Sequence, residues 1–137
     1  MNEPLPPEVF CQQVPSVAEY VTAFRAIELE MGEHHFRMLR AHYHAMDHTV
    51  TASEMARAIR YASYSSANLH YGKLGRKLAE ALGFRLKYWV NSLADFIGPD
   101  EGLPHWLWIM WPQVGAALEE LGWISTDQDE SGLDESP

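Results

Sequence analysis

The chain has 137 residues, of which 47% are hydrophobic and 12% aromatic, which is enough to build the core of one domain. Its net charge of −9, taken whole, argues against a nucleic-acid-binding protein, because lysine and arginine supply most of the affinity for phosphate. The single cysteine, Cys11, excludes an intramolecular disulfide and favours a reducing compartment. No apolar run is long enough for a membrane span and no signal peptide is recognisable, so we expect a cytoplasmic protein with no membrane partner.

The charges are unevenly distributed along the chain. All ten basic residues lie within residues 25–87, together with six acidic ones, so this stretch carries a charge of +4. Residues 125–137 contain five acidic residues and no basic one. This composition predicts a disordered acidic tail, which could shield the basic stretch until DNA displaces it.

The N-terminal part is predicted to be an arm followed by two helices. Four prolines within residues 1–15 predict an extended arm. Apolar residues then recur at steps of three and four over residues 16–31, which predicts an amphipathic helix that Gly32 ends or bends. The pattern resumes and predicts a second helix over residues 36–45.

Residues 51–84 predict two helices joined by a tight turn. Thr51 and Glu54 are spaced as a capping box at the start of the first helix. The helical pattern breaks over residues 61–64, and a second helix is expected from about Ser65. One stripe of that helix is apolar, and the opposite side carries Lys73, Arg76, Lys77 and Glu80. This is the pattern of a helix-turn-helix whose second helix enters a DNA groove, and also that of any packed helical hairpin.

A narrow third stripe of the second helix carries small side chains. It contains Asn68, Gly72, Gly75 and Ala79. Each glycine costs a helix about 1 kcal/mol relative to alanine. We therefore expect a neighbouring helix or a phosphate backbone to approach closely here.

The C-terminal part is predicted to be a β-hairpin and a helix. Alternation over residues 84–91 predicts one strand, residues 98–102 a loop, and residues 105–111 a second strand. A last helix is expected from Pro112 to Gly122. The expected fold is mainly α with a small β-hairpin, a winged helix-turn-helix with two extra N-terminal helices over residues 16–124.

Two stretches of the chain resemble a segment that precedes the nuclease domain in some bacterial HNH endonucleases of the restriction type: TASEMARAIRYASYSSANLHYGKLGRKLAEALG and PQVGAALEELGW. The similarity covers about residues 42–123, and its most specific part runs from Asn68 to Gly75. The resemblance implies a non-catalytic module that helps a nuclease locate DNA. In those enzymes a nuclease domain follows, whereas this chain continues into the acidic tail and offers no histidine-asparagine-histidine metal finger. Recognition of DNA without cleavage is therefore what the resemblance implies.

Histidines gather ahead of the helix-turn-helix, at His34, His35, His42, His44 and His48. The spacing of His44 and His48 would suit zinc on a helical face. However, Asp47 and the Thr51 cap indicate that the helix is already ending, and no third ligand is identifiable. We expect polar histidines on a helix face and in a loop, with no metal site and no cofactor.

Motifs for nucleophilic catalysis, phosphate loops and dinucleotide binding are lacking in the sequence. Cys11 lies in the proline-rich arm with no basic neighbour that would activate its thiol. We therefore expect that the protein is not an enzyme.

The basic helix has two interpretations, a solvated face or a DNA contact. The capped preceding helix, the small-residue stripe and the basic residues of the expected hairpin favour DNA. The candidate DNA-binding residues are Tyr64, Ser65, Ser66, Asn68, His70, Lys73, Arg76, Lys77, Arg85 and Lys87. Those at the helix start would reach base edges or phosphates, the lysines and arginines would neutralise phosphates, and Tyr64 would pack on the backbone.

The first functional hypothesis is therefore a non-catalytic protein that binds double-stranded DNA, as a regulator or as a restriction-like targeting module. The alternative is a protein-binding module on the same scaffold, such as an inhibitor of a nucleic-acid-binding defence complex. In that case the surplus tryptophans Trp106, Trp108 and Trp111 would face the partner.

Overall fold

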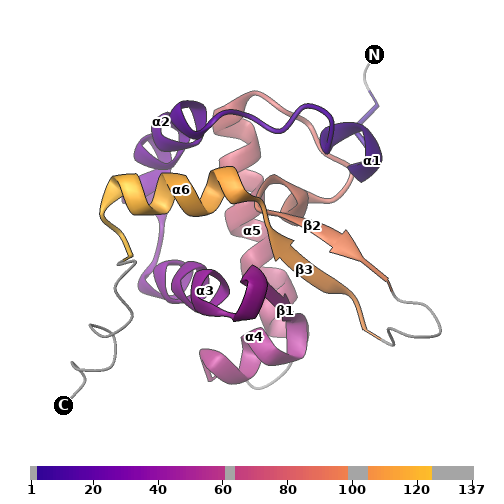
Figure 1. Cartoon of the computed structure of the whole chain (residues 1–137), viewed down its shortest axis with the longest axis vertical. Coiled ribbons are helices and arrows are strands. Elements are labelled where there is room, and N and C mark those ends of the chain that lie inside the picture. Colours follow the sequence, from indigo (N-terminus) through magenta and orange to yellow (C-terminus); the bar gives the residue numbers. More distant parts are fainter. Residues whose placement is uncertain (1–2, 61–63, 99–104, 125–137) are drawn as a thin grey trace.

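The computed structural model describes residues 3–60, 64–98 and 105–124. These residues form a mainly helical protein with a small three-stranded antiparallel sheet (Figure 1). The elements in chain order are α1 (Pro7–Phe10), α2 (Val17–Ile27), the 3-10 helix η1 (Glu28–Glu30), α3 (Glu33–His44), the 3-10 helix η2 (Met46–His48), β1 (Thr49–Thr51), α4 (Ala52–Ala58), α5 (Tyr64–Leu82), the 3-10 helix η3 (Trp89–Ser92), β2 (Ala94–Ile97), β3 (Leu107–Met110) and α6 (Pro112–Leu121). Within the described ranges, no helix is both long enough and apolar enough to cross a membrane.

The two predicted N-terminal helices are confirmed as α2 and α3. A capping box starts α2, in which the Ser16 hydroxyl accepts from the Glu19 N–H at 3.1 Å and the Glu19 carboxylate accepts from the Ser16 N–H at 2.8 Å. The segment before it differs from the extended arm that was expected. Pro7–Phe10 form a helical turn, because proline at the first position of a helix forfeits no hydrogen bond. Phe10 is fully buried against Phe84, so the packed unit begins well before Ser16.

The two helices predicted at the centre of the chain are also confirmed, whereas the turn predicted between them lies mostly outside the described residues. The Thr51 hydroxyl accepts from the Glu54 N–H at 3.0 Å, and the Glu54 carboxylate accepts from the Thr51 N–H at 2.9 Å, which caps α4. Along α5 the expected apolar stripe is buried, with Tyr71, Leu74 and Leu78 fully inaccessible. Through this stripe and its flanks α5 packs against α2, α4 and η3.

The strand predicted over residues 84–91 is wrong. Leu86 forms only an isolated bridge with Leu5 near the N-terminus, and the chain then turns through η3. The hydroxyl of Ser92 donates to the Gly75 carbonyl at 2.8 Å, which ties this turn to α5. The first strand of the hairpin is instead β2, which begins at Ala94.

The second predicted strand is confirmed as β3, which pairs on both sides. The strand order is β1-β3-β2, with Val50 and Phe96 both opposite Trp108. Strand β1 was not predicted, because three residues are too few to show an alternation. Thus the hairpin β2–β3 gains a third strand from the segment just before α4, and it projects from the helices at one side of the molecule (Figure 1). The loop expected between the two hairpin strands falls mostly outside the described residues.

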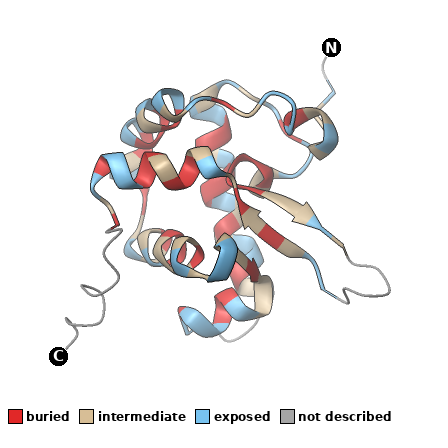
Figure 2. Ribbon diagram, viewed as in Figure 1, coloured by how far each residue is buried: buried red, intermediate tan, exposed pale blue. Residues whose placement is uncertain are grey.

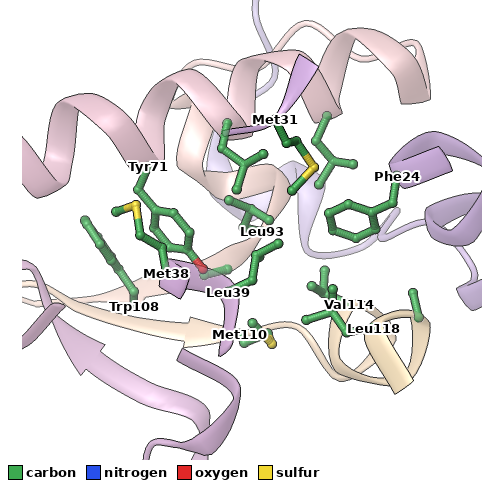
Figure 3. Close-up of a cluster of buried hydrophobic side chains, with 14 of the residues drawn as sticks. Phe24, Met31, Met38, Leu39, Tyr71, Leu93, Trp108, Met110, Val114 and Leu118 are labelled. Atoms are coloured by element: carbon green, nitrogen blue, oxygen red, sulfur yellow. The ribbon is translucent and has the colours of Figure 1, made fainter. Parts of the chain in front are cut away.

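The helix predicted after the hairpin is confirmed as α6, which Gly122 ends in a left-handed conformation with φ of +77°. Trp123 follows and packs edge-on against Phe24 and Phe36. The acidic tail predicted over residues 125–137 lies outside the described residues. One core joins the helices to the sheet, and Figure 3 shows Tyr71 of α5 beside Trp108 of β3 within it.

Candidate nucleic-acid interface

The outward side of α5 is the central feature of the candidate interface. At 100° per residue Ser65, Leu69, Gly72 and Arg76 form one row, opposite the buried row that contains Leu74. In this row Ser65, Leu69 and Arg76 are exposed, whereas Tyr71 and Leu74 on the other side are inaccessible. Figure 2 shows that buried and exposed residues alternate along α5, as expected when one side of the helix is buried. The helix therefore presents an accessible surface from Ser65 in its first turn to Arg76 in its fourth turn.

Four of the predicted DNA-binding residues share this accessible surface: Ser65, Asn68, Lys73 and Arg76. Asn68 lies on the flank of α5 that faces the hairpin, and it lines a hollow with Trp106 and Trp108. Lys73 is exposed and has no acidic partner among the residues that the structure describes.

The other candidates on α5 lie elsewhere. His70 and Lys77 occupy the opposite flank, where the His70 ring lies 5.0 Å from that of His34 in α3, and the Lys77 ammonium lies 3.3 Å from the Glu30 carboxylate. Ser66 is half-buried. Tyr64 begins the helix, but its side chain is outside the described part of the structure.

Arg85 and Lys87 are not part of the hairpin, contrary to the expectation. They flank Leu86 in the segment before η3, and the Lys87 N–H donates to the Leu5 carbonyl at 2.8 Å. Both side chains are nevertheless exposed. The Lys87 ammonium lies 5.6 Å from the centre of the Tyr88 ring, so its charge is adjacent to the aromatic side chains of the hairpin.

Two of the candidate basic residues on α5 are paired with carboxylates. Arg76 contacts Glu80 at 3.1 Å on α5 itself, and Lys77 contacts Glu30 of η1. Exposed pairs of this kind contribute only about 0 to 1 kcal/mol, because water and salt screen them. A phosphate can therefore compete for these cations at little cost, although the acids lower the net positive charge of the surface.

The sequence did not indicate two exposed apolar side chains near the hairpin, Tyr88 and Leu69. Their exposed fractions are 49% and 55%, and that of the neighbouring Trp106 is 53%. The ring of Phe96 lies between those of Tyr88 and Trp106, at 5.7 and 5.9 Å between centres, both edge-to-face. Leu69 could have been identified, because it falls off the apolar stripe of α5. The exposed position of Tyr88 could not have been identified from the sequence, because it depends on the turn of the chain at η3.

Only one of the three tryptophans expected to face a partner is largely exposed, namely Trp106. Trp108 is 5% exposed and belongs to the core. The indole N–H of Trp111 donates to the Asn91 carbonyl at 2.8 Å, and its ring is half-buried against Phe10.

The small-residue stripe of α5 receives a partial explanation. A Cβ on Gly75 would lie 2.4 Å from the carbonyl oxygen of Trp89, so the absence of a side chain allows η3 to approach the helix. A Cβ on Gly72 would meet nothing within 4 Å. The fold therefore requires glycine at position 75, whereas position 72 leaves open space on the accessible surface.

The histidines fall into separate environments. His42 is fully buried, and burial lowers its pKa to about 4. His34 and His35 lie at the start of α3, with ring centres 4.0 Å apart. Burial, with the charge of His34, lowers the pKa of His35 to about 4, and burial with the charges of His70 and Arg37 lowers that of His34. Among the described residues no group of three histidine, cysteine or acidic side chains is arranged to bind a metal ion.

Comparisons of the chain with models of protein families, with curated proteins and with solved structures gave no match.

Proposed function

We propose that this protein is a winged helix-turn-helix that binds double-stranded DNA without cutting it. The observation that carries the proposal is the accessible surface of α5, where Asn68, Lys73 and Arg76 are exposed on a helix whose other side is buried. A helix presented in this way can enter the major groove, where asparagine pairs with adenine and lysine or arginine contacts guanine or phosphate.

The arrangement around α5 supports the winged form of the motif. The capped helix α4 precedes α5, and the hairpin β2–β3 follows it in the chain and lies beside its N-terminal half. In this proposal α5 reads the groove, and the hairpin lies over the adjacent backbone. Ser65 and Asn68 are near the helix start and reach base edges, whereas Lys73 and Arg76 neutralise phosphates.

The resemblance to the segment that precedes HNH nuclease domains supports the same role. Its most specific part, from Asn68 to Gly75, forms two turns of α5 that include the exposed residues Asn68 and Lys73. The protein would thus act as a targeting module or as a regulator, both of which use the same contact with DNA.

The test is a titration of a mixed-sequence duplex, followed by fluorescence anisotropy at about 50 and about 200 mM salt. We expect binding at low salt that weakens steeply as salt rises, because each phosphate contact releases counterions. Lys73→Ala and Arg76→Ala should each weaken binding and reduce the slope of log affinity against log salt by about 1.

Arg25→Ala is the matched control. Arg25 is an exposed cation that pairs with Glu28 on α2, away from the proposed contact surface, so its loss should leave the salt slope unchanged. Absence of binding by the wild-type protein at the lower salt concentration would overturn the proposal, and so would an equal effect of all three substitutions.

A second candidate function, binding of a protein partner, is favoured by the exposed apolar side chains. Leu69, Tyr88, Ile97 and Trp106 are each more than 40% exposed. Apolar patches of this kind mark interaction sites in soluble proteins. Complex formation through them would depend little on salt, which separates it from DNA binding in the same titration.

A further inference from the structure

The surface between α5 and the hairpin contains two adjoining hollows. The larger, of about 400 Å³, is lined by Tyr88, Val90 and Phe96, and the smaller, of about 290 Å³, by His105 and the start of α4. Both hollows share Asn68, Trp106 and Trp108. We call them together the hairpin hollow.

Planar rings form one wall of the hairpin hollow. The rings of Tyr88, Phe96 and Trp106 make a row in which neighbouring rings meet edge-to-face. Tyr88 and Trp106 are about half exposed. A flat aromatic ligand gains stacking energy on such a surface, and every nucleobase has a face that can stack.

The polar groups of the hairpin hollow suit a base rather than a hydrocarbon. Asn68 contributes a carboxamide, which both donates and accepts hydrogen bonds and can therefore read the edge of a base. Among the described residues no acidic side chain lines the hollow. Lys87, whose ammonium lies 5.6 Å from the Tyr88 ring, brings a positive charge to the rim for a phosphate.

We propose that the hairpin hollow receives an unstacked nucleobase, so that the protein binds DNA with an unpaired base more tightly than fully paired duplex. The inference rests on the proposed binding of DNA and adds the class of DNA that is preferred. A base within a duplex has both faces covered by its neighbours and cannot stack on Trp106. An unpaired base leaves the stack at a lower cost, which a ring contact can repay.

The test compares two labelled duplexes of equal length, one fully paired and one with a single bulged nucleotide at its centre. Anisotropy titrations with the full chain should show about tenfold tighter binding of the bulged duplex, as one base stacked on an aromatic side chain allows. Trp106→Leu should bring the ratio of the two affinities close to one. Lys73→Ala should weaken binding of both duplexes and keep the ratio.

Tyr88→Leu is a second variant, which tests the same ring wall if Trp106→Leu disturbs folding. The circular dichroism spectrum of each variant is compared with that of the wild type to check that it folds. Equal affinity for the two duplexes, with the expected salt dependence, would overturn this inference alone. A preference for the bulge that survives both substitutions would also overturn it. Binding of neither duplex would overturn the proposed function as well, and would point to a protein side chain as the occupant.

Discussion

The imidazole of His42 in α3 and the phenol of Tyr71 in α5 are joined by a hydrogen bond of 2.8 Å inside the core. The second ring nitrogen of His42, Nε2, lies 2.9 Å from the Trp108 carbonyl of β3. Because a carbonyl only accepts, Nε2 carries the proton, and Nδ1 accepts from the Tyr71 hydroxyl. One neutral histidine thus connects α3 and α5 to the sheet, and both its ring nitrogens have partners.

We expect His42→Ala to destabilise the protein by about 2 to 4 kcal/mol. The substitution leaves the buried Tyr71 hydroxyl without its acceptor, removes one donor from the Trp108 carbonyl, and removes the packing of the ring. The matched control is His44→Ala, since His44 is exposed on the same helix and should change stability by less than about 0.5 kcal/mol. Urea unfolding followed by circular dichroism measures both. Similar losses for the two variants would contradict this account of the network.

Stability should also fall with pH in a defined window. Burial lowers the pKa of His42 in the folded protein to about 4, below the usual histidine pKa of 6.5. As pH falls between these values, the unfolded chain binds the proton while folded His42 does not, so folding becomes less favourable by up to about 3 kcal/mol from this residue. The stabilisation that neutral His42 provides is fully present above about pH 7, and the loss is complete below about pH 4. His35, whose pKa is lowered to about 4, acts in the same direction.

The measurement is the free energy of unfolding in urea at several pH values across this window. His42→Gln serves as the comparison, because its amide can donate and accept but does not titrate. Its stability should depend less steeply on pH than that of the wild type. Parallel curves for the two proteins would show that His42 is not the residue that titrates.

Much of the fold was predictable because it is encoded locally. The capping box at Thr51, the apolar stripe of α5 and the terminal glycine of α6 each act over a few residues, and each is confirmed. The prediction of the first hairpin strand was wrong, because contacts with residues far away in the sequence override the local alternation. Leu86 pairs with Leu5, and these partners are visible only in the folded molecule.

The candidate site was predictable in part for the same reason. Helical spacing sufficed to indicate the outward position of Lys73 and Arg76. It could not show that η3 would bring Tyr88 to the hairpin, or that Lys77 would be turned toward Glu30. The different environments of the tryptophans, Trp108 in the core and Trp106 at the surface, depend on where β3 begins, because Trp108 lies within β3 and Trp106 precedes it.

The two glycines of α5 should respond in opposite ways to alanine. Gly75→Ala drives a Cβ to 2.4 Å from the Trp89 carbonyl, so η3 must move, and we expect a loss of at least about 1 kcal/mol. Gly72→Ala meets no atom within 4 Å and should raise stability by about 0.5 to 1 kcal/mol, because alanine favours the helix. Thermal and urea unfolding of the two variants form a matched pair. If Gly75→Ala were as stable as Gly72→Ala, the close approach of η3 would not be what requires the glycine.

Removing the acid that pairs with Arg76 should strengthen binding of DNA. Glu80→Gln frees the Arg76 guanidinium, which now lies 3.1 Å from the carboxylate, and removes a negative charge that repels phosphate. The stability of the fold should change by less than about 1 kcal/mol, because both side chains are more than half exposed. Duplex titrations at low salt should give a severalfold higher affinity. Glu120→Gln on α6 makes the same change of net charge at an exposed position of another helix and should have the smaller effect. Equal gains from the two substitutions would mean that total charge, and not the surface of α5, governs binding.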